Sequence, residues 1–111
     1  MTVVKFSEAE KTAIAEGRLR YLAHTNDLMV VVIDFTDGPQ TEPDPPHSHP
    51  HEQITYVAEG ELLFFIDGEP QKLSTGDLIT VDGDVPHTIQ LLSDKVRLVD
   101  TFNPIREEFL K

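Results

Sequence analysis

The stretch Pro46-His-Ser-His-Pro-His-Glu-Gln-Ile-Thr-Tyr-Val-Ala-Glu-Gly-Glu61 joins three histidines to the alternating pattern of a strand. In extended chain, residues two apart point to the same side and lie roughly 6–7 Å apart. His47 and His49 therefore share a side, and their imidazoles can converge on one metal ion with bonds of about 2.0–2.1 Å. The same parity places Gln53 inward and Glu52 outward if the strand continues past the intervening proline. The alternative interpretation is two polar histidines in a proline-rich loop.

Short strands are predicted on both sides of this stretch. Most have β-branched or aromatic residues and end at a turn cluster, and Asp67-Gly68 is a strong hairpin signal. Residues 38–46 contain four prolines and predict a stiff extended loop. Many short strands with turns every 8–12 residues are typical of a sandwich or barrel. The predicted strands cover residues 18–23, 28–35, 53–58, 61–66, 71–73, 78–81, 87–92 and 96–102.

One short helix is predicted near the N-terminus. Ser7 and Glu10 have the spacing of a capping box, and Gly17 offers a helix stop. The polar tail after residue 103 carries Phe109 and Leu110, which we expect to dock on the domain. The fold class expected from the pattern is all-β with this one helix.

Length and composition limit what the chain can be. Its 111 residues suit one domain, 1–111, and the longest apolar run, residues 28–33, is far too short for a bilayer span. The absence of cysteine excludes disulfides and thiolate metal sites. A net charge of −11 argues against nucleic acid or an anionic membrane as partner. Without a secretory signal at its start, the chain is expected in the cytoplasm.

Two sequence motifs resemble those of the cupin superfamily. The first motif is His-x-His, then Glu or Gln, then Gly, and the second is a Gly-led turn that ends in His. The positions of this chain that fit the two motifs are His47, His49, Gln53 and Gly60, and then Gly76 and His87. In the second motif this chain has Asp82 where the family has Pro, Asp84 where it has Gly, and Leu91 where it has Asn. The resemblance covers residues 38–102.

This resemblance implies a double-stranded β-helix, the cupin jelly-roll barrel. It also implies one divalent transition metal (Zn, Ni, Fe or Mn) held by His47, His49, Gln53 and His87. Three imidazoles and an amide are neutral, so the charge of the ion remains available to attract an anionic small molecule. His51 is expected in the loop or behind the ligands rather than on the metal.

The strand at residues 96–102 places one acidic side chain among apolar ones. Asp100 shares its face with Leu98 and Phe102, and a carboxylate inside a barrel is costly unless it is paired or used. One interpretation is an ion pair with an inward arginine such as Arg20. The other is a catalytic acid or base that faces the metal cavity.

The ending at residues 98–110, together with the histidine-rich stretch, is similar to the pectin-degradation cupins. That resemblance implies a metal-dependent isomerase-type enzyme that converts a 4,5-unsaturated cyclic uronate into its linear keto form, with Asp100 catalytic and Phe102 binding the substrate. Arg20 and Arg106 are candidates for holding the uronate carboxylate. The alternatives are an Fe(II) cupin dioxygenase and a non-catalytic module that binds a sugar or small acid. Small cupins are commonly homodimers, and outward-facing Ile54 and Tyr56 are candidates for the interface.

Overall fold

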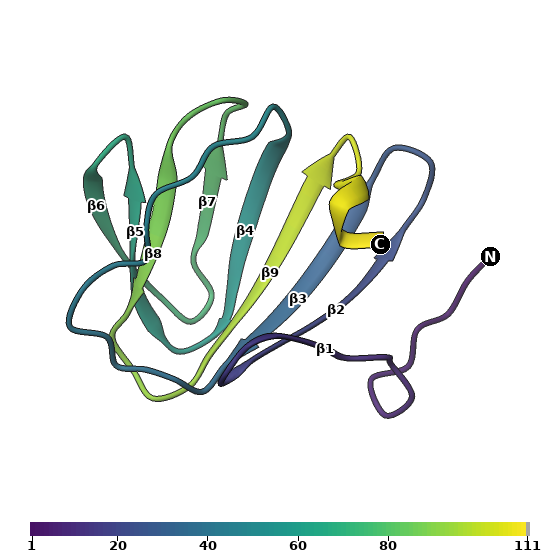
Figure 1. Cartoon of the computed structure of the whole chain (residues 1–111), viewed down its shortest axis with the longest axis horizontal. Coiled ribbons are helices and arrows are strands. Elements are labelled where there is room, and N and C mark those ends of the chain that lie inside the picture. The colour runs from purple at the N-terminus through teal and green to yellow at the C-terminus, as the bar shows by residue number, and fades with distance from the viewer. Residues whose placement is uncertain (111) are drawn as a thin grey trace.

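Two antiparallel β-sheets face each other across one apolar core in the computed structural model, which describes residues 1–110 (Figure 1). The larger sheet has the strand order β1-β2-β3-β9-β4-β7 and the smaller has the order β6-β5-β8. The strands are β1 (Thr12–Ala15), β2 (Arg18–His24), β3 (Met29–Phe35), β4 (Glu52–Glu59), β5 (Glu61–Ile66), β6 (Glu69–Ser74), β7 (Leu78–Val81), β8 (His87–Leu91) and β9 (Val96–Asn103). A single 3-10 turn, η1 (Glu107–Leu110), follows β9. The prediction of an all-β fold is confirmed.

Side chains from both sheets fill the core. Val57 on β4, Leu62 and Phe64 on β5, Leu91 on β8 and Leu98 on β9 belong to one buried cluster. Alternation along β4 and β9 sends every second residue inward, as period-2 strands require. Toward the other end of β9, the buried Asp100 lies between this cluster and a second apolar cluster of Met29, Val31 and Phe102, and that end holds the candidate site.

The predicted N-terminal helix is wrong. Residues 6–8 form a turn, and β1 pairs with β2 through the register Thr12↔Arg20 and Ala13↔Leu19. Gly17, expected to stop the helix, lies instead in the hairpin turn with φ of 78°. A helix of about ten residues is marginal on its own, whereas the free edge of β2 offers backbone hydrogen bonds along its length.

Two turns adopt left-handed backbone conformations that their residues tolerate. Asp67 and Gly68 both have positive φ, 51° and 83°, which confirms the hairpin predicted between β5 and β6. Asp84 has a φ of 65° at the position where the cupin motif has Gly. Its backbone N–H donates to the carbonyl of His49 at 2.7 Å. This turn therefore ties the segment before β8 to the histidine-rich loop.

Within residues 1–110, the chain has no helix that is long and apolar enough to cross a bilayer.

Candidate functional site

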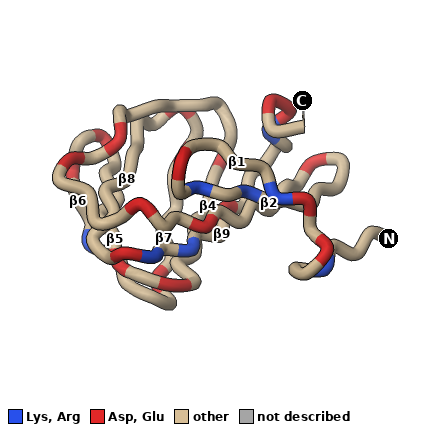
Figure 2. Tube along the Cα trace, turned by 60° about the horizontal axis from the view of Figure 1, so that its bottom comes forward, with Lys and Arg blue, Asp and Glu red and all other residues tan. Residues whose placement is uncertain are grey.

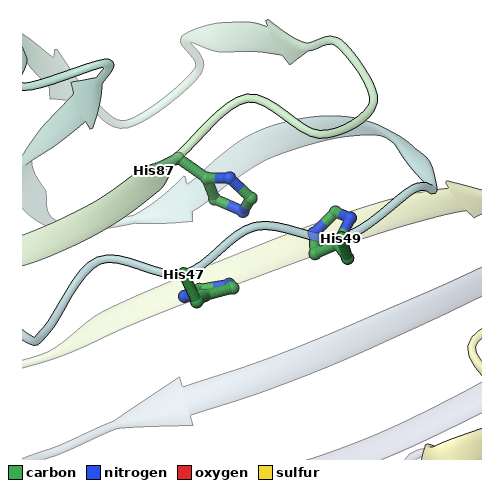
Figure 3. A group of neighbouring side chains, drawn as sticks. All are labelled: His47, His49 and His87. Atoms are coloured by element: carbon green, nitrogen blue, oxygen red, sulfur yellow. The ribbon is translucent and has the colours of Figure 1, made fainter.

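Three histidines from two separate segments face one another at the end of the barrel. His47 and His49 lie on the loop before β4, and His87 begins β8 (Figure 3). One ring nitrogen from each lies within 4.8 Å of the others. The ring centroid of His87 lies 4.4 Å from that of His47 and 4.8 Å from that of His49. These three residues could form a metal site.

A backbone bridge brings the two segments together. His47 and His87 are paired as an isolated antiparallel bridge, with N–O distances of 3.0 and 2.9 Å in the two directions. The ring of Phe64 stacks on the imidazole of His87 with an interplanar angle of 7°. Backbone pairing and ring packing therefore fix His87 next to the loop.

Hydrogen bonds determine which nitrogen of two of the rings is free. Nδ1 of His49 lies 3.1 Å from the carbonyl oxygen of His51, and Nδ1 of His87 lies 2.9 Å from that of Val85. A carbonyl oxygen only accepts, so each Nδ1 carries the proton and each Nε2 keeps its lone pair. Nε2 of His87 is buried with no partner. An unpaired buried acceptor aimed at two other imidazoles fits a metal ion bound there.

The protonation of the three rings also favours metal binding. Burial lowers the pKa of His47 to about 4, with the nearby His87 and His49 as further causes. Burial likewise lowers the pKa of His49 and of His87. The rings are therefore neutral at neutral pH, which is the form that ligates metal.

Gln53 lies beside the triad on β4. It is 6% exposed while its neighbour Glu52 is exposed, so the parity prediction for both is confirmed. Its Oε1 lies 3.1 Å from Nε2 of His49. Two atoms bound to one ion at right angles, each about 2.1 Å from it, lie about 3 Å apart. The placement of Gln53 fits a fourth ligand.

Asp100 is buried on β9, and none of the ion pairs within residues 1–110 includes it. Its carboxylate accepts a hydrogen bond of 2.6 Å from the hydroxyl of Thr55. Burial raises the pKa of Asp100 to about 6. Arg20, the predicted ion-pair partner, lies over the ring of Phe109 at 4.2 Å instead. The ion-pair interpretation of Asp100 is therefore not supported.

A cavity of about 300 Å³ connects these groups. Its polar lining includes His47, Gln53, His87 and Asp100, and Phe102 lies in its wall. Arg18, Arg20 and Arg106 also line it, in a chain whose net charge is −11. The cavity therefore combines a candidate metal site, a carboxyl group of raised pKa and positive charge.

The three arginines differ in whether an acidic side chain pairs with them. Arg18 is held by Asp37 at 3.0 Å and by Asp44 at 2.7 Å. Arg106 pairs with the half-exposed Glu108 and lies over the ring of Phe102 at 5.1 Å. Arg20 has no acidic partner among the ion pairs of residues 1–110. Arg20 and Arg106 are thus the guanidinium groups best able to meet an anion.

The C-terminal turn closes one side of the cavity. Phe109 on η1 packs edge-on against Phe102, with ring centroids 6.1 Å apart, so the predicted docking is confirmed for Phe109, whereas Leu110 is exposed. The guanidinium groups of Arg20 and Arg106 lie 4.2 and 4.3 Å from the ring of Phe109. This arrangement holds both cations at the cavity wall.

Some residues of the site carried no separate signal in the sequence. Thr55 shares the inward parity of Gln53, but a threonine in a strand does not by itself indicate a site. Arg18 and Asp44 look like ordinary surface charges until β2 and the proline-rich loop are brought together. His51 is not part of the triad. Its carbonyl orients His49, as a residue behind the ligands would.

Comparisons with known proteins agree with the two sequence motifs. The sequence model of the Cupin domain family matches residues 33–102. The chain is 36% identical over 92 residues to the pectin degradation protein KdgF of Dickeya dadantii (strain 3937), covering 82% of this chain and 81% of that protein. It is 32% identical over 96 residues to the quercetin 2,3-dioxygenase of Bacillus subtilis (strain 168), covering 85% of this chain but 26% of that enzyme.

Solved structures show the same architecture. The structure of KdgF from Halomonas sp. superposes with a TM-score of 0.87 at 29% identity and covers 98% of both chains. An RmlC-like cupin from Shewanella frigidimarina gives a TM-score of 0.85 at 32% identity over 98% of this chain and 96% of its own. The double-stranded β-helix expected from the motifs is confirmed.

Proposed function

The chain belongs to the cupin family, and from that premise we propose that it is a metal-dependent enzyme that opens and tautomerises a 4,5-unsaturated cyclic uronate. The observation that carries the proposal is a single cavity lined by two imidazoles of the histidine triad, by a buried carboxyl group without an ion-pair partner, and by Arg20 and Arg106. The similarity to the pectin degradation protein KdgF supports a substrate from pectin breakdown.

His47, His49 and His87, with Gln53 as a fourth ligand, would hold one divalent ion, for which we keep Zn, Ni, Fe and Mn as candidates. Such an ion supplies Lewis acidity toward a ring oxygen or hydroxyl and a carboxylate of the sugar. The four protein groups are neutral, so they leave its charge available for an anionic substrate.

Asp100 is the group that moves the proton. As a carboxylate it takes the proton of the anomeric hydroxyl while the C1 carbonyl forms and the bond from C1 to the ring oxygen breaks. The ring oxygen leaves as the enolate of C4 and C5, and this enolate takes the same proton back from Asp100 at C4 to become the C5 ketone, which restores the carboxylate. The product is an isomer of the substrate, so no oxidant is needed. A pKa of about 6 suits a group that both takes and returns a proton near neutral pH.

Phe102, Arg20 and Arg106 bind the sugar acid. The buried ring of Phe102 offers an apolar surface to one face of the sugar. Arg106 and Arg20 offer guanidinium groups to the carboxylate. Figure 2 shows acidic residues spread over many loops, with basic residues on β2. The rest of the surface repels anionic polymers, so we propose a small sugar acid in the cytoplasm as the partner.

The second candidate is an Fe(II) dioxygenase, which the 32% identity to a quercetin 2,3-dioxygenase favours. Such an enzyme consumes molecular oxygen, whereas ring opening and tautomerisation do not. A non-catalytic binding module would use the same cavity and would not need Asp100 for turnover.

The test is an assay of the metal-loaded protein on an unsaturated uronate. Turnover is measured as the loss of absorbance of the conjugated chromophore near 230 nm. We expect an acceleration of roughly ten-thousandfold with metal, loss of activity after chelation, and no oxygen uptake. Oxygen uptake that accompanies turnover would favour the dioxygenase. Tight substrate binding with the same slow rate for unmodified protein and Asp100→Ala would favour the binding module.

A further inference from the structure

Four buried side chains form one row from the histidine triad to the carboxyl group, and hydrogen bonds join its last three members. Oε1 of Gln53 faces Nε2 of His49 at 3.1 Å, and Nε2 of Gln53 donates to Oγ1 of Thr55 at 2.9 Å. The hydroxyl of Thr55 then donates to Oδ1 of Asp100 at 2.6 Å. The row therefore connects the candidate metal position to the candidate catalytic group.

The sheet register builds this row. Gln53 and Thr55 are two apart on β4 and so point to the same side. Thr55 lies directly opposite Asp100 on the neighbouring strand β9, and it is completely buried. Loss of the Thr55 hydroxyl would leave its two hydrogen-bond partners, Gln53 and Asp100, without this buried partner.

The row has a direction, because a hydroxyl has a single hydrogen. Thr55 donates that hydrogen to the carboxylate of Asp100, so toward Gln53 the hydroxyl can only accept a hydrogen bond. The side of the Gln53 amide that faces Thr55 must then be its NH₂ group. The carbonyl oxygen is consequently turned toward the histidines, where a metal ion would need it.

We propose that Thr55 is a positioning residue that turns the Gln53 amide oxygen to the metal, and that the Thr55–Asp100 pair is the reason this chain has Gln rather than Glu at position 53. This inference rests on the metal site of the proposed function and does not depend on the reaction or substrate.

A glutamate at position 53 would not need Thr55 to orient its oxygen toward the metal. Its carboxylate has only acceptors, so Thr55 would have one hydrogen for two carboxylates. A carboxylate also presents an oxygen to the metal whichever way it turns. Thr55 should therefore matter for metal binding when residue 53 is an amide, and matter little when it is a carboxylate.

The experiment measures Zn²⁺ affinity of metal-stripped protein by competition with a chromophoric chelator at about pH 8. Thr55→Val should weaken binding roughly 10- to 100-fold, the usual effect of losing a group that orients a ligand. Thr55→Ser, which keeps the hydroxyl, should stay within about threefold of the unmodified protein. In the Gln53→Glu background the same Thr55→Val change should cost less than about threefold. Thr80→Val, an exposed threonine on β7, is the matched control.

Unchanged affinity in Thr55→Val, or an equal loss in both backgrounds, would overturn the proposal. A second measurement uses the unmodified protein and so does not depend on the folding of any variant. The side-chain NH₂ resonances of Gln53, assigned by their absence in Gln53→Glu, should exchange slowly with solvent and stay protected when Zn²⁺ is added. Rapid exchange would show that the NH₂ group is not held by Thr55. Because neither measurement uses a uronate, failure here is distinct from failure of the proposed reaction.

Discussion

Asp100 combines burial, a single hydroxyl donor and a place in the cavity wall. Asp100→Asn keeps the shape and an oxygen that accepts from Thr55, but an amide cannot exchange a proton near neutral pH. We expect the variant to keep its fold and metal and to lose turnover by roughly a hundredfold to ten-thousandfold. Asp94→Asn, at an exposed turn, is the control in the same rate and metal assays. A rate unchanged by Asp100→Asn, with a lower melting temperature, would leave Asp100 a structural role only.

The raised pKa of Asp100 has a consequence for stability. Between its ordinary value of 3.8 and about 6, folded protein keeps a proton that unfolded protein releases, so this group lowers stability as the pH rises through that window. Relative to Asp100→Asn, the metal-free protein should lose about 2 kcal/mol of stability between about pH 4 and about pH 7. The histidines titrate in both proteins and cancel in the difference. Urea unfolding at the two pH values gives the measurement, and a constant difference would contradict it.

Parity along two strands was enough to place most of the site residues. Gln53 on β4 and Asp100 and Phe102 on β9 all point inward as the alternation predicts. The row through Thr55 could not be predicted, because it depends on the cross-strand register of β4 with β9. Register is set by the whole sheet, and no local pattern in either strand specifies it.

At the scale of elements, the sequence predicted the strands that end at clear turn residues. It did not predict the strand β1 near the N-terminus. The capping-box pattern at Ser7 describes a local preference, whereas β1 owes its structure to pairing with β2. The C-terminal turn η1 has no periodic pattern, and its position depends on the contact of Phe109 with Phe102. Tertiary contacts decided both ends of the chain.

The turn before β8 offers a test at the same scale. Asp84 occupies a left-handed conformation, which costs a residue with a Cβ roughly 1–2 kcal/mol, less for Asp than for most residues. Asp84→Ala should therefore lower the free energy of unfolding by about 1 kcal/mol, while Asp84→Gly should be close to neutral. Thermal and urea unfolding of the two variants compare them. Equal losses in both would mean that the Asp side chain, rather than the backbone, matters at this turn.

For the whole molecule, the outer face of the large sheet carries several exposed apolar side chains. Tyr56 pairs with Leu78, and Ile54 is linked through Thr101 to Val30. The exposed apolar residues of this face are Val30, Ile54, Tyr56 and Leu78, each at least 40% exposed. Exposed patches of this kind mark contacts between proteins. We propose that this face joins two copies of the chain.

Light scattering should accordingly give the mass of two chains. Ile54→Glu with Tyr56→Glu should give one chain that still binds metal, since both side chains point away from the cavity. Val3→Glu, which changes an equally apolar exposed residue outside the sheet, should leave the dimer intact. A mass of one chain for the unmodified protein would exclude the dimer.

The most direct test of the central claim follows the reaction of a 4,5-unsaturated uronate in D₂O by ¹H NMR. The account predicts that the metal-loaded protein converts it to the linear keto acid with one deuteron placed at C4, and that Asp100→Asn does so far more slowly. Unchanged substrate with fully metal-loaded protein, or a product that has gained oxygen, would contradict the account.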